Sequence, residues 1–148
     1  MLDSKFFPLV AGIAAAITIS VLAYLEAFTG QGLWLMAPFG ASTVLVFGLP
    51  KSPLAQPKNV FFGHVLSALV GVIFVTFVGV EPWSLGVATG VAIALMLVTK
   101  TTHPPAGANP VLIMLTGQSW SFLLTPVAVG AVVIIAMGFA VNKLVHKQ

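Results

Sequence analysis

Residues 37–42 read Ala-Pro-Phe-Gly-Ala-Ser, and residues 104–109 read Pro-Pro-Ala-Gly-Ala-Asn. Each stretch runs directly into an apolar segment, and Gly107 follows Gly40 by 67 positions, as Pro105 follows Pro38. The same interval separates further pairs of small residues, namely Gly12 and Gly79, Ala27 and Ala94, Gly63 and Gly130, and Gly71 and Gly138. The chain is therefore predicted to contain two copies of one unit of about 67 residues.

The composition indicates a membrane protein. Hydrophobic residues make up 59% of the 148 residues and charged residues only 6%, whereas soluble domains carry about 25% charged residues. So few charges cannot cover a water-facing surface, and we expect a single transmembrane domain over residues 1–148. The six lysines form no basic cluster, which argues against binding of nucleic acid. Because cysteine is absent, disulfides and thiol catalysis are excluded.

Long apolar runs predict the membrane-spanning helices. A helix needs about 20 apolar residues to cross the hydrocarbon core. Residues 6–28, 60–80 and 122–141 meet this requirement, and residues 84–98 come close if the helix extends through Pro82-Trp83. The first run is too long for the apolar part of a signal peptide, so we expect it to be retained as a span.

Two further apolar segments, 33–49 and 99–116, are interrupted by the repeated motif. Proline and glycine disrupt the interior of a helix, but proline is favoured in the first turn. We therefore predict half-helices from Pro38 to about Leu49 and from Pro105 to about Thr116, each preceded by extended chain. Such non-helical backbone at membrane depth must be buried in protein or line a polar cavity.

The distribution of charge favours six crossings over four. If every segment crosses and the N-terminus is cytoplasmic, Glu26 and Glu81 lie outside, and all six lysines lie inside, namely Lys5, Lys51, Lys58, Lys100, Lys143 and Lys147. With four crossings, three of these lysines would lie opposite the termini. Six crossings give three per copy, so the copies, about 6–80 and 83–142, would be inverted repeats. The expected fold is all-α, and each repeat has two spanning helices and one broken segment with a half-helix.

The starts of the two half-helices are the candidate substrate site. A helix start has unpaired N–H groups and positive dipole density, which suit an anion. The residues expected to bind are Phe39, Gly40, Ala41 and Ser42 in the first copy and Ala106, Gly107, Ala108 and Asn109 in the second. Glycine allows a ligand close to the backbone, and Ser42 and Asn109 add side-chain donors. The alternative is that the motif only permits close helix packing.

A polar segment precedes the second half-helix and completes the candidate site: Lys100, Thr101, Thr102 and His103. Lys100 either supplies positive charge to an anion or follows the positive-inside rule. The threonines are candidate hydroxyl donors. His103 either gates, titrates or donates a hydrogen bond, or orients the loop before two prolines. The first copy has Leu33 and Met36 at the positions of Lys100 and His103, so the polar share of the site lies in the second copy.

Other notable residues are assigned structural roles. We interpret His64 as structural or interfacial and Glu26 as a residue of the outer interface. The three tryptophans, Trp34, Trp83 and Trp120, are expected to be interface anchors, and the paired glycines Gly63, Gly71, Gly130 and Gly138 to be helix-packing positions. The sequence has no phosphate loop, no Cys/His metal cluster and no carboxylate pair, so we expect neither an enzyme nor a bound metal or cofactor.

The stretch His103-Pro104-Pro105-Ala106-Gly107-Ala108 resembles the signature of the HPP family of integral membrane proteins, and residues 37–42 also look like that family. The resemblance runs from roughly Trp34 to Val141. Members of this family are usually described with four spanning helices, and those of cyanobacteria and chloroplasts are implicated in nitrite transport. Some members carry an appended regulatory domain. The resemblance therefore implies a stand-alone protein of a bacterial inner membrane, with nitrite as its substrate.

Together these features predict a transporter or channel for a small monovalent anion, bound near the bilayer midplane between the two half-helix starts. We expect both termini to be cytoplasmic, and the partners to be the small inorganic anion, membrane lipid and further copies of the chain in a homo-oligomer. One alternative is a channel for a small neutral solute. Another is a non-transporting membrane module that acts through partners, although such a module has no need of buried helix breaks.

Overall fold

The computed structural model describes residues 5–30 and 34–145, and in this part of the chain every regular element is a helix. The all-α prediction is confirmed for these residues. Leu33 and Lys147, on which part of the motif and charge argument depends, lie outside the described residues.

The helical segments follow the predicted order. They are α1 (Phe7–Thr29), α2 (Ala37–Thr43) continued by the π-helical turn η1 (Val44–Gly48), the 3-10 turn η2 (Pro53–Ala55), α3 (Pro57–Phe77), α4 (Pro82–Val98), the 3-10 turn η3 (Pro104–Ala108), α5 (Asn109–Thr116), the π-helical turn η4 (Leu123–Ala128) and α6 (Val129–Val145). Three helices are long and apolar enough to cross a membrane, at Phe7–Thr29, Pro57–Phe77 and Leu123–Lys143. Ala37–Gly48 and Pro82–Val98 are shorter apolar helices.

Proline and glycine set the helix boundaries. Pro38, Pro57 and Pro82 lie in the first turns of α2, α3 and α4, where the missing N–H group has no partner to lose. Gly30 and Gly117 end α1 and α5 in the left-handed conformation that glycine adopts without strain. The predicted starts and ends of the spans therefore agree with the structure to within a few residues.

The start of the last span differs from the regular helix expected from Phe122. Pro126 lies inside the π-helical turn η4, and Thr125 before it has an extended backbone. Proline lacks the N–H group that a regular turn needs and restricts the residue before it. The regular helix α6 begins only at Val129.

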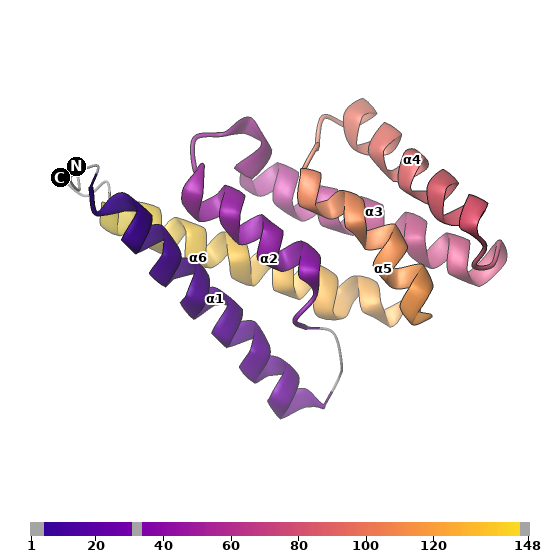
Figure 1. Cartoon of the computed structure of the whole chain (residues 1–148), viewed down its shortest axis with the longest axis horizontal. Coiled ribbons are helices and arrows are strands. Elements are labelled where there is room, and N and C mark those ends of the chain that lie inside the picture. Colours follow the sequence, from indigo (N-terminus) through magenta and orange to yellow (C-terminus); the bar gives the residue numbers. More distant parts are fainter. Residues whose placement is uncertain (1–4, 31–33, 146–148) are drawn as a thin grey trace.

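The helices run back and forth between two edges of the molecule, and the start of α1 and the end of α6 lie close together at one edge (Figure 1). The helix α6 passes behind α1 and α2, and α3 passes behind α5. These neighbours are in contact, and α3 also packs against α4 and α6. Because α3 contacts both copies of the predicted unit, it holds the bundle together.

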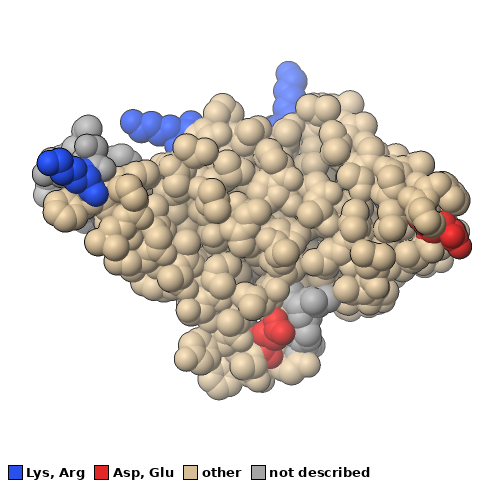
Figure 2. Space-filling view, in the orientation of Figure 1, with Lys and Arg blue, Asp and Glu red and all other residues tan. Residues whose placement is uncertain are grey.

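The charged residues separate by sign. In Figure 2 the lysine atoms in view lie along the upper and left edges, and the acidic atoms lie at the lower and right edges. Combined with helices that alternate between the two edges, this separation is the one expected from six crossings under the positive-inside rule. The number of crossings and the side that faces the cytoplasm stay predictions.

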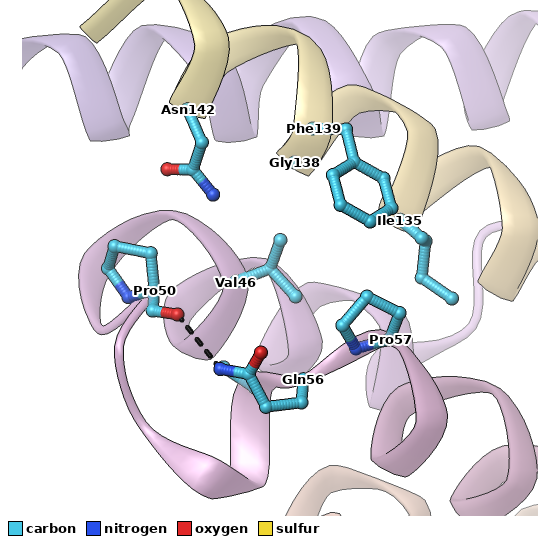
Figure 3. A pocket seen from close by; sticks show the side chains of 9 residues that line it. Val46, Pro50, Gln56, Pro57, Ile135, Gly138, Phe139 and Asn142 are labelled. Carbon is cyan, nitrogen blue, oxygen red and sulfur yellow. Dashed lines mark hydrogen bonds between the residues drawn. The ribbon is translucent and has the colours of Figure 1, made fainter. Parts of the chain in front are cut away.

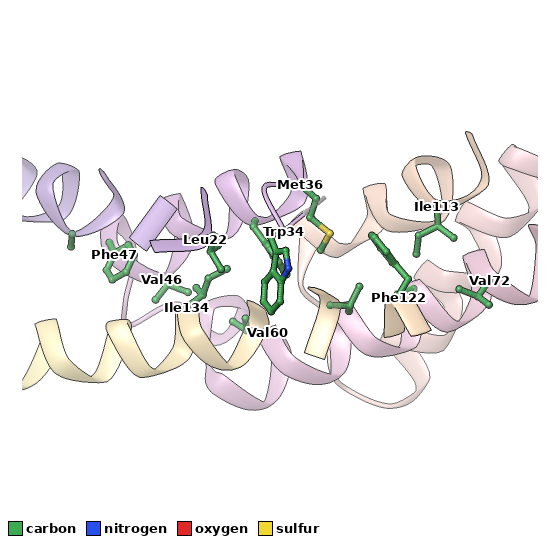
Figure 4. Packing of buried hydrophobic residues seen from close by; sticks show 14 residues of the cluster. Leu22, Trp34, Met36, Val46, Phe47, Val60, Val72, Ile113, Phe122 and Ile134 are labelled. Carbon is green, nitrogen blue, oxygen red and sulfur yellow. The ribbon is translucent and has the colours of Figure 1, made fainter. Parts of the chain in front are cut away.

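The apolar core lies between the two copies. It includes Leu22 of α1, Val46 of η1, Val60 of α3 and Ile134 of α6, which lie on one side of Trp34 in Figure 4, whereas Phe122 lies on the other side. Trp34 is only 5% exposed, so its predicted role as an interface anchor is wrong. Trp83 and Trp120, in contrast, are exposed near helix ends, as an anchor must be. Trp34 belongs to the buried core cluster, and its burial depends on tertiary packing that the local sequence does not reveal.

Four glycines allow the closest helix contacts, which confirms their predicted packing role. A Cβ atom on Gly63 would lie 2.7 Å from Cβ of His103 and 3.6 Å from Cβ of Ala106, and one on Gly130 would overlap the ring of Phe39. Farther along the same two helices, a Cβ atom on Gly71 would lie 3.1 Å from Cβ of Ile113, and one on Gly138 would lie 2.6 Å from Cγ1 of Val46.

These contacts form two pairs that share the interval of 67 positions. The contact of Gly63 with Ala106 corresponds to that of Gly130 with Phe39, and the contact of Gly71 with Ile113 corresponds to that of Gly138 with Val46. In every case a long helix of one copy packs on the half-helix of the other copy.

The topology can be tested with single cysteines, because the chain has none of its own. Pro53 and Ser119 are both exposed. Pro53 lies just before α3 and Ser119 lies between α5 and η4, so six crossings place them on opposite sides of the membrane. With six crossings, a membrane-impermeant thiol reagent added outside the cell should label Ser119→Cys but not Pro53→Cys, and lysis should make both react. Equal labelling of both positions from outside would contradict the six-crossing topology.

The glycine contacts predict a compensating pair of substitutions. Gly138→Ala should destabilise the protein by about 1–3 kcal/mol, because the new methyl group overpacks the contact with Val46. Adding Val46→Ala removes the atom that it meets, so the double variant should lose at least about 1 kcal/mol less than the sum of the single variants. Unfolding in detergent measures these differences. The control is Gly12→Ala, where a Cβ atom meets nothing within 4 Å; it should be neutral or stabilising by up to about 1 kcal/mol.

Candidate functional site

The starts of the two half-helices meet inside the bundle. Met36 precedes α2 with an extended backbone, and His103 precedes η3 in the same way. The helix α2 packs directly against η3. The structure therefore brings together the two motifs that lie 67 positions apart in the sequence.

The N–H groups at these starts differ from the prediction. The N–H group of Phe39 donates to the carbonyl of Met36, and that of Ala106 donates to the carbonyl of His103, both at 2.9 Å. These are bonds across three residues, which tighten a first turn and use donors that a regular α-helix leaves free. The expectation that Phe39 and Ala106 offer unpaired N–H groups to an anion is therefore wrong.

Each start has a buried side and an open side. Phe39 and Ala106 face the interior, under Gly130 and Gly63. A Cβ atom on Gly40 or Gly107 would meet nothing within 4 Å, and the neighbouring Ala41 and Ala108 are exposed. The sequence predicts one site from these residues, whereas the structure places them on two faces of the helix starts.

A hydrogen-bonded polar network lies on the buried side, and the hydroxyl of Ser42 is its centre. Ser42 Oγ lies 2.8 Å from Nε2 of His64 and 2.8 Å from Nε2 of His103. It is also 2.9 Å from the carbonyl oxygen of Pro38 in its own helix. All three side chains are completely buried. The network therefore joins α2, α3 and the second half-helix at one oxygen atom.

Asn109 extends the network on the side of the second copy. Its Nδ2 lies 3.1 Å from Nδ1 of His64 and donates to the His64 carbonyl at 3.1 Å and to Ser67 Oγ at 2.9 Å. Ser67 in turn donates to the carbonyl of Gly63. Asn109 and Ser42 occupy equivalent positions in the two motifs, and both contact the same histidine.

Two buried polar atoms have no hydrogen-bond partner within the described residues: Oδ1 of Asn109 and Nε1 of Trp34. An unpaired buried polar atom costs about 1–3 kcal/mol, so buried polar groups are generally satisfied. The Asn109 oxygen can only accept, so it suits a ligand or water molecule that donates a hydrogen bond.

The loop before the second half-helix fixes His103 in place. His103 Nδ1 donates to the Leu54 carbonyl of η2 at 2.8 Å, and Asn59 Nδ2 of α3 donates to the carbonyl of Thr102 at 2.9 Å. Thr101 is buried and its hydroxyl pairs with that of Thr99 at 2.7 Å. Thr99 and Thr101 therefore form the turn that ends α4, and they do not present free hydroxyl groups to a ligand.

Lys100 lies at the tip of this turn. Its φ is 53°, in the left-handed region, and its side chain is exposed. The structure places it on the surface, three positions before the buried His103, and not inside the network.

Sequence reasoning missed His64 and Ser67. Of the two roles predicted for His64, structural or interfacial, the interfacial one is wrong, because His64 is completely buried and contacts Ser42, Asn109 and the Phe39 ring, with ring centroids 5.1 Å apart. An ionisable residue within a predicted span is a functional candidate by default. His64 lies four positions inside the predicted span 60–80, so that signal was present in the sequence.

A separate pocket of about 70 Å³ lies between the η1–η2 region and α6. Its lining includes Val46, Pro50, Gln56, Gly138, Phe139 and Asn142 (Figure 3). Gln56 Nε2 donates to the Pro50 carbonyl at 3.2 Å. None of the predicted site residues lines this pocket, so it is distinct from the half-helix starts.

The chain is similar to one known family over nearly its whole length. A family model described as the HPP transmembrane region matches residues 6–148. The chain belongs to the HPP transmembrane family. The matched region contains both half-helix starts, the buried network and all the long helices.

Two transmembrane proteins of Dictyostelium discoideum are similar to this HPP chain. One is 36% identical over 146 residues, which cover 93% of this chain and 51% of the relative. The other is 34% identical over 140 residues, which cover 89% of this chain and 45% of the relative. The chain thus spans about half the length of these curated relatives. No solved structure matches it.

The network predicts that Asn109 stabilises the fold. Asn109→Ala removes the amide group that donates hydrogen bonds to Ser67 Oγ and His64 Nδ1. Leaving these buried polar groups unpaired should cost about 1–3 kcal/mol of the free energy of unfolding. Asn142→Ala, at the rim of the separate pocket, is the matched control and should change stability by less than about 0.5 kcal/mol. Thermal unfolding in detergent measures both. Equal losses in the two variants would show that the network adds nothing to stability.

Proposed function

We propose that the protein is a transporter or channel for a small monovalent anion, most specifically nitrite, which passes the open side of the two half-helix starts. The observation that carries this proposal is the meeting of two helix starts whose glycines, Gly40 and Gly107, have nothing within 4 Å of a Cβ position. The first turn of a helix carries partial positive charge, and glycine leaves the backbone within reach of a ligand. Membership of a transmembrane family is consistent with this role.

The internal repeat supports a transport function. The contacts of the four packing glycines are related by the interval of 67 positions, and α3 shifted by this interval covers residues 124–144, which is the region of η4 and α6. Apart from the short turn η2, each copy has three helical segments, and successive segments run in opposite directions (Figure 1). Two copies with an odd number of crossings are inverted relative to each other, and inverted repeats with broken helices place transporter sites near the midplane.

The open side of the starts also supports assembly into a homo-oligomer. Backbone at a helix break cannot face lipid tails, because its polar groups have no partner there. Gly86, Gly90 and Ala94 lie four positions apart on the exposed side of α4, and small residues at this spacing favour contacts between membrane helices. A second copy is therefore the natural cover for these faces, and lipid covers the remaining apolar surface.

We place the protein in a bacterial inner membrane with both termini cytoplasmic.

A channel for a small neutral solute is the second candidate. The buried network holds no charged group, and its unpaired atom, Oδ1 of Asn109, is an acceptor that suits a hydrogen-bond donor rather than an anion. Osmotic swelling of proteoliposomes with urea or glycerol distinguishes this function from nitrite transport.

Nitrite flux into proteoliposomes tests the first candidate. The purified protein should carry nitrite faster than protein-free liposomes, with nitrate, formate and chloride as competitors. Gly107→Val should reduce this flux at least tenfold, because the new side chain fills the open space beside the backbone. The variant should still fold, since that space contains no neighbouring atom. Gly12→Val on α1, at an equally open position, is the control and should retain the flux. Normal flux through folded Gly107→Val would exclude this face as the path.

A further inference from the structure

We propose that His103 binds a proton together with the anion, so that the protein co-transports one proton with each nitrite ion. This inference rests on the proposed transport function. It comes from the hydrogen bonds of Ser42, His64 and His103, which define where hydrogen atoms lie and which ring can accept one more.

The hydrogen-bond partners at the two ends of the network determine which nitrogen of each neutral histidine ring carries the hydrogen. His103 Nδ1 faces the carbonyl oxygen of Leu54, and a carbonyl only accepts, so Nδ1 carries the hydrogen and Nε2 carries a lone pair. The amide nitrogen of Asn109 only donates: one of its hydrogens goes to Ser67 Oγ, and the other is shared between the carbonyl and Nδ1 of His64, both 3.1 Å away. Nδ1 of His64 is therefore the acceptor, and the hydrogen of that ring is on Nε2.

Ser42 matches these two forms. His64 Nε2 donates to Ser42 Oγ, and the Ser42 hydroxyl donates to the lone pair of His103 Nε2, both at 2.8 Å. The Pro38 carbonyl, 2.9 Å from the same Oγ atom, is a second acceptor for the one hydrogen of Ser42. The hydroxyl therefore has two acceptors within reach and can donate to only one of them at a time.

A proton added to His103 is accommodated by rotation of this hydroxyl. The proton forms an N–H bond with the lone pair of Nε2, and the ring gains one positive charge. His103 Nε2 then donates to Ser42 Oγ, while the Ser42 hydrogen turns to the Pro38 carbonyl. Every heavy-atom contact remains a hydrogen bond, and no other covalent bond forms or breaks.

His64 does not have this property. A proton on Nδ1 of His64 would face the amide donor of Asn109 at 3.1 Å, so two donors would oppose each other. His103 is thus the residue that can exist in both protonation states in this site. His64 and Ser42 are positioning residues, because they hold the hydrogen bonds that allow the change.

Among the residues that the structure describes, those around His103 carry no negative charge to balance the proton. The elements that pack on η3 are α2, α3, α4 and α5, and of these only α3 carries titratable side chains within its bounds, Lys58 and His64. Lys100 precedes η3, η2 has no charged residue, and Glu81 lies just before the first turn of α4, at the far end of that helix. Glu26 accepts a hydrogen bond from the N–H of Leu35.

An anion at the neighbouring half-helix start supplies the missing charge. A buried unpaired cation is costly, so protonated His103 gains stability when nitrite lies beside Gly107, four positions along the chain. By linkage, protonation raises the affinity for the anion by the same factor. The pair that crosses the membrane is then electrically neutral, which lowers the cost of passing through the low-dielectric interior.

Proteoliposomes that contain a pH-sensitive dye test the coupling with nitrite as the probe, after subtraction of nitrous acid leakage into protein-free liposomes. The wild-type protein should move about one proton with each nitrite ion, its flux should not respond to an imposed membrane potential, and subsaturating flux should rise up to about tenfold for each unit that the external pH falls. His103→Asn keeps a donor for the Leu54 carbonyl but lacks the second nitrogen. This variant should lose the coupled proton, and any remaining nitrite flux should respond to the membrane potential.

The outcomes separate the two hypotheses. Nitrite flux without proton movement in the wild-type protein, or full proton coupling in His103→Asn, overturns the role of His103 and leaves anion transport intact. Absence of flux for nitrite and for its competitors overturns the transport function itself, and the coupling with it.

Nitrogen NMR of the histidine rings provides a second readout that a purely structural role would not move. The chain has three histidines, His64, His103 and His146, so His146→Gln leaves two sets of signals to assign. In nanodiscs without anion, His103 should carry its hydrogen on Nδ1 and His64 on Nε2. Saturating nitrite should convert His103 alone to the doubly protonated ring. No change at His103, or a change at His64 instead, would overturn the proposal.

Discussion

The structure depends on one constraint: two helix starts lie inside an apolar bundle, and their polar groups must find partners there. Lipid offers no hydrogen bonds to broken backbone. The first turns of α2 and η3 satisfy part of their own backbone with bonds from Phe39 to Met36 and from Ala106 to His103. The polar side chains of the two motifs satisfy each other through His64. The helix breaks are tolerated in the membrane because the two starts lie together and their polar groups hydrogen-bond.

This meeting requires very close packing, which glycine provides. The long helices α3 and α6 each present two glycines, and a methyl group at any of the four positions would press on the half-helix of the other copy. Apolar surfaces gain little by leaving lipid, so association of membrane helices relies on such tight contacts and on hydrogen bonds between helices. Gly63 serves both purposes, since it lies against His103 and its carbonyl accepts from Ser67.

The sequence predicted the framework well because that framework is encoded locally. Proline in first turns, glycine after last turns and apolar runs of about 20 residues all act within a few neighbours, so the half-helices begin within one residue of Pro38 and Pro105. The errors concern properties that depend on tertiary packing. Trp34 is buried by tertiary packing, which the residues next to it in the sequence do not determine. The shape of the first helical turn decides whether the N–H group of Phe39 is free. The partners of His64 come from positions 22 and 45 residues away, so no local pattern could identify them.

The packing of the two copies is similar, but their polar groups are not. Ser42 and Asn109 are equivalent by position and both reach His64, whereas the positions equivalent to His64 and His103 are Ala131 and Met36. If the two copies exchanged conformations, as inverted repeats do in alternating access, these apolar residues could not rebuild the network. The exchange would leave several buried polar groups without partners, at about 1–3 kcal/mol for each. The polar cluster therefore stabilises the observed arrangement over the one in which the two copies have exchanged conformations. A transport cycle in this fold must either break the network in one step or leave it intact and move the anion along the open side of the helix starts.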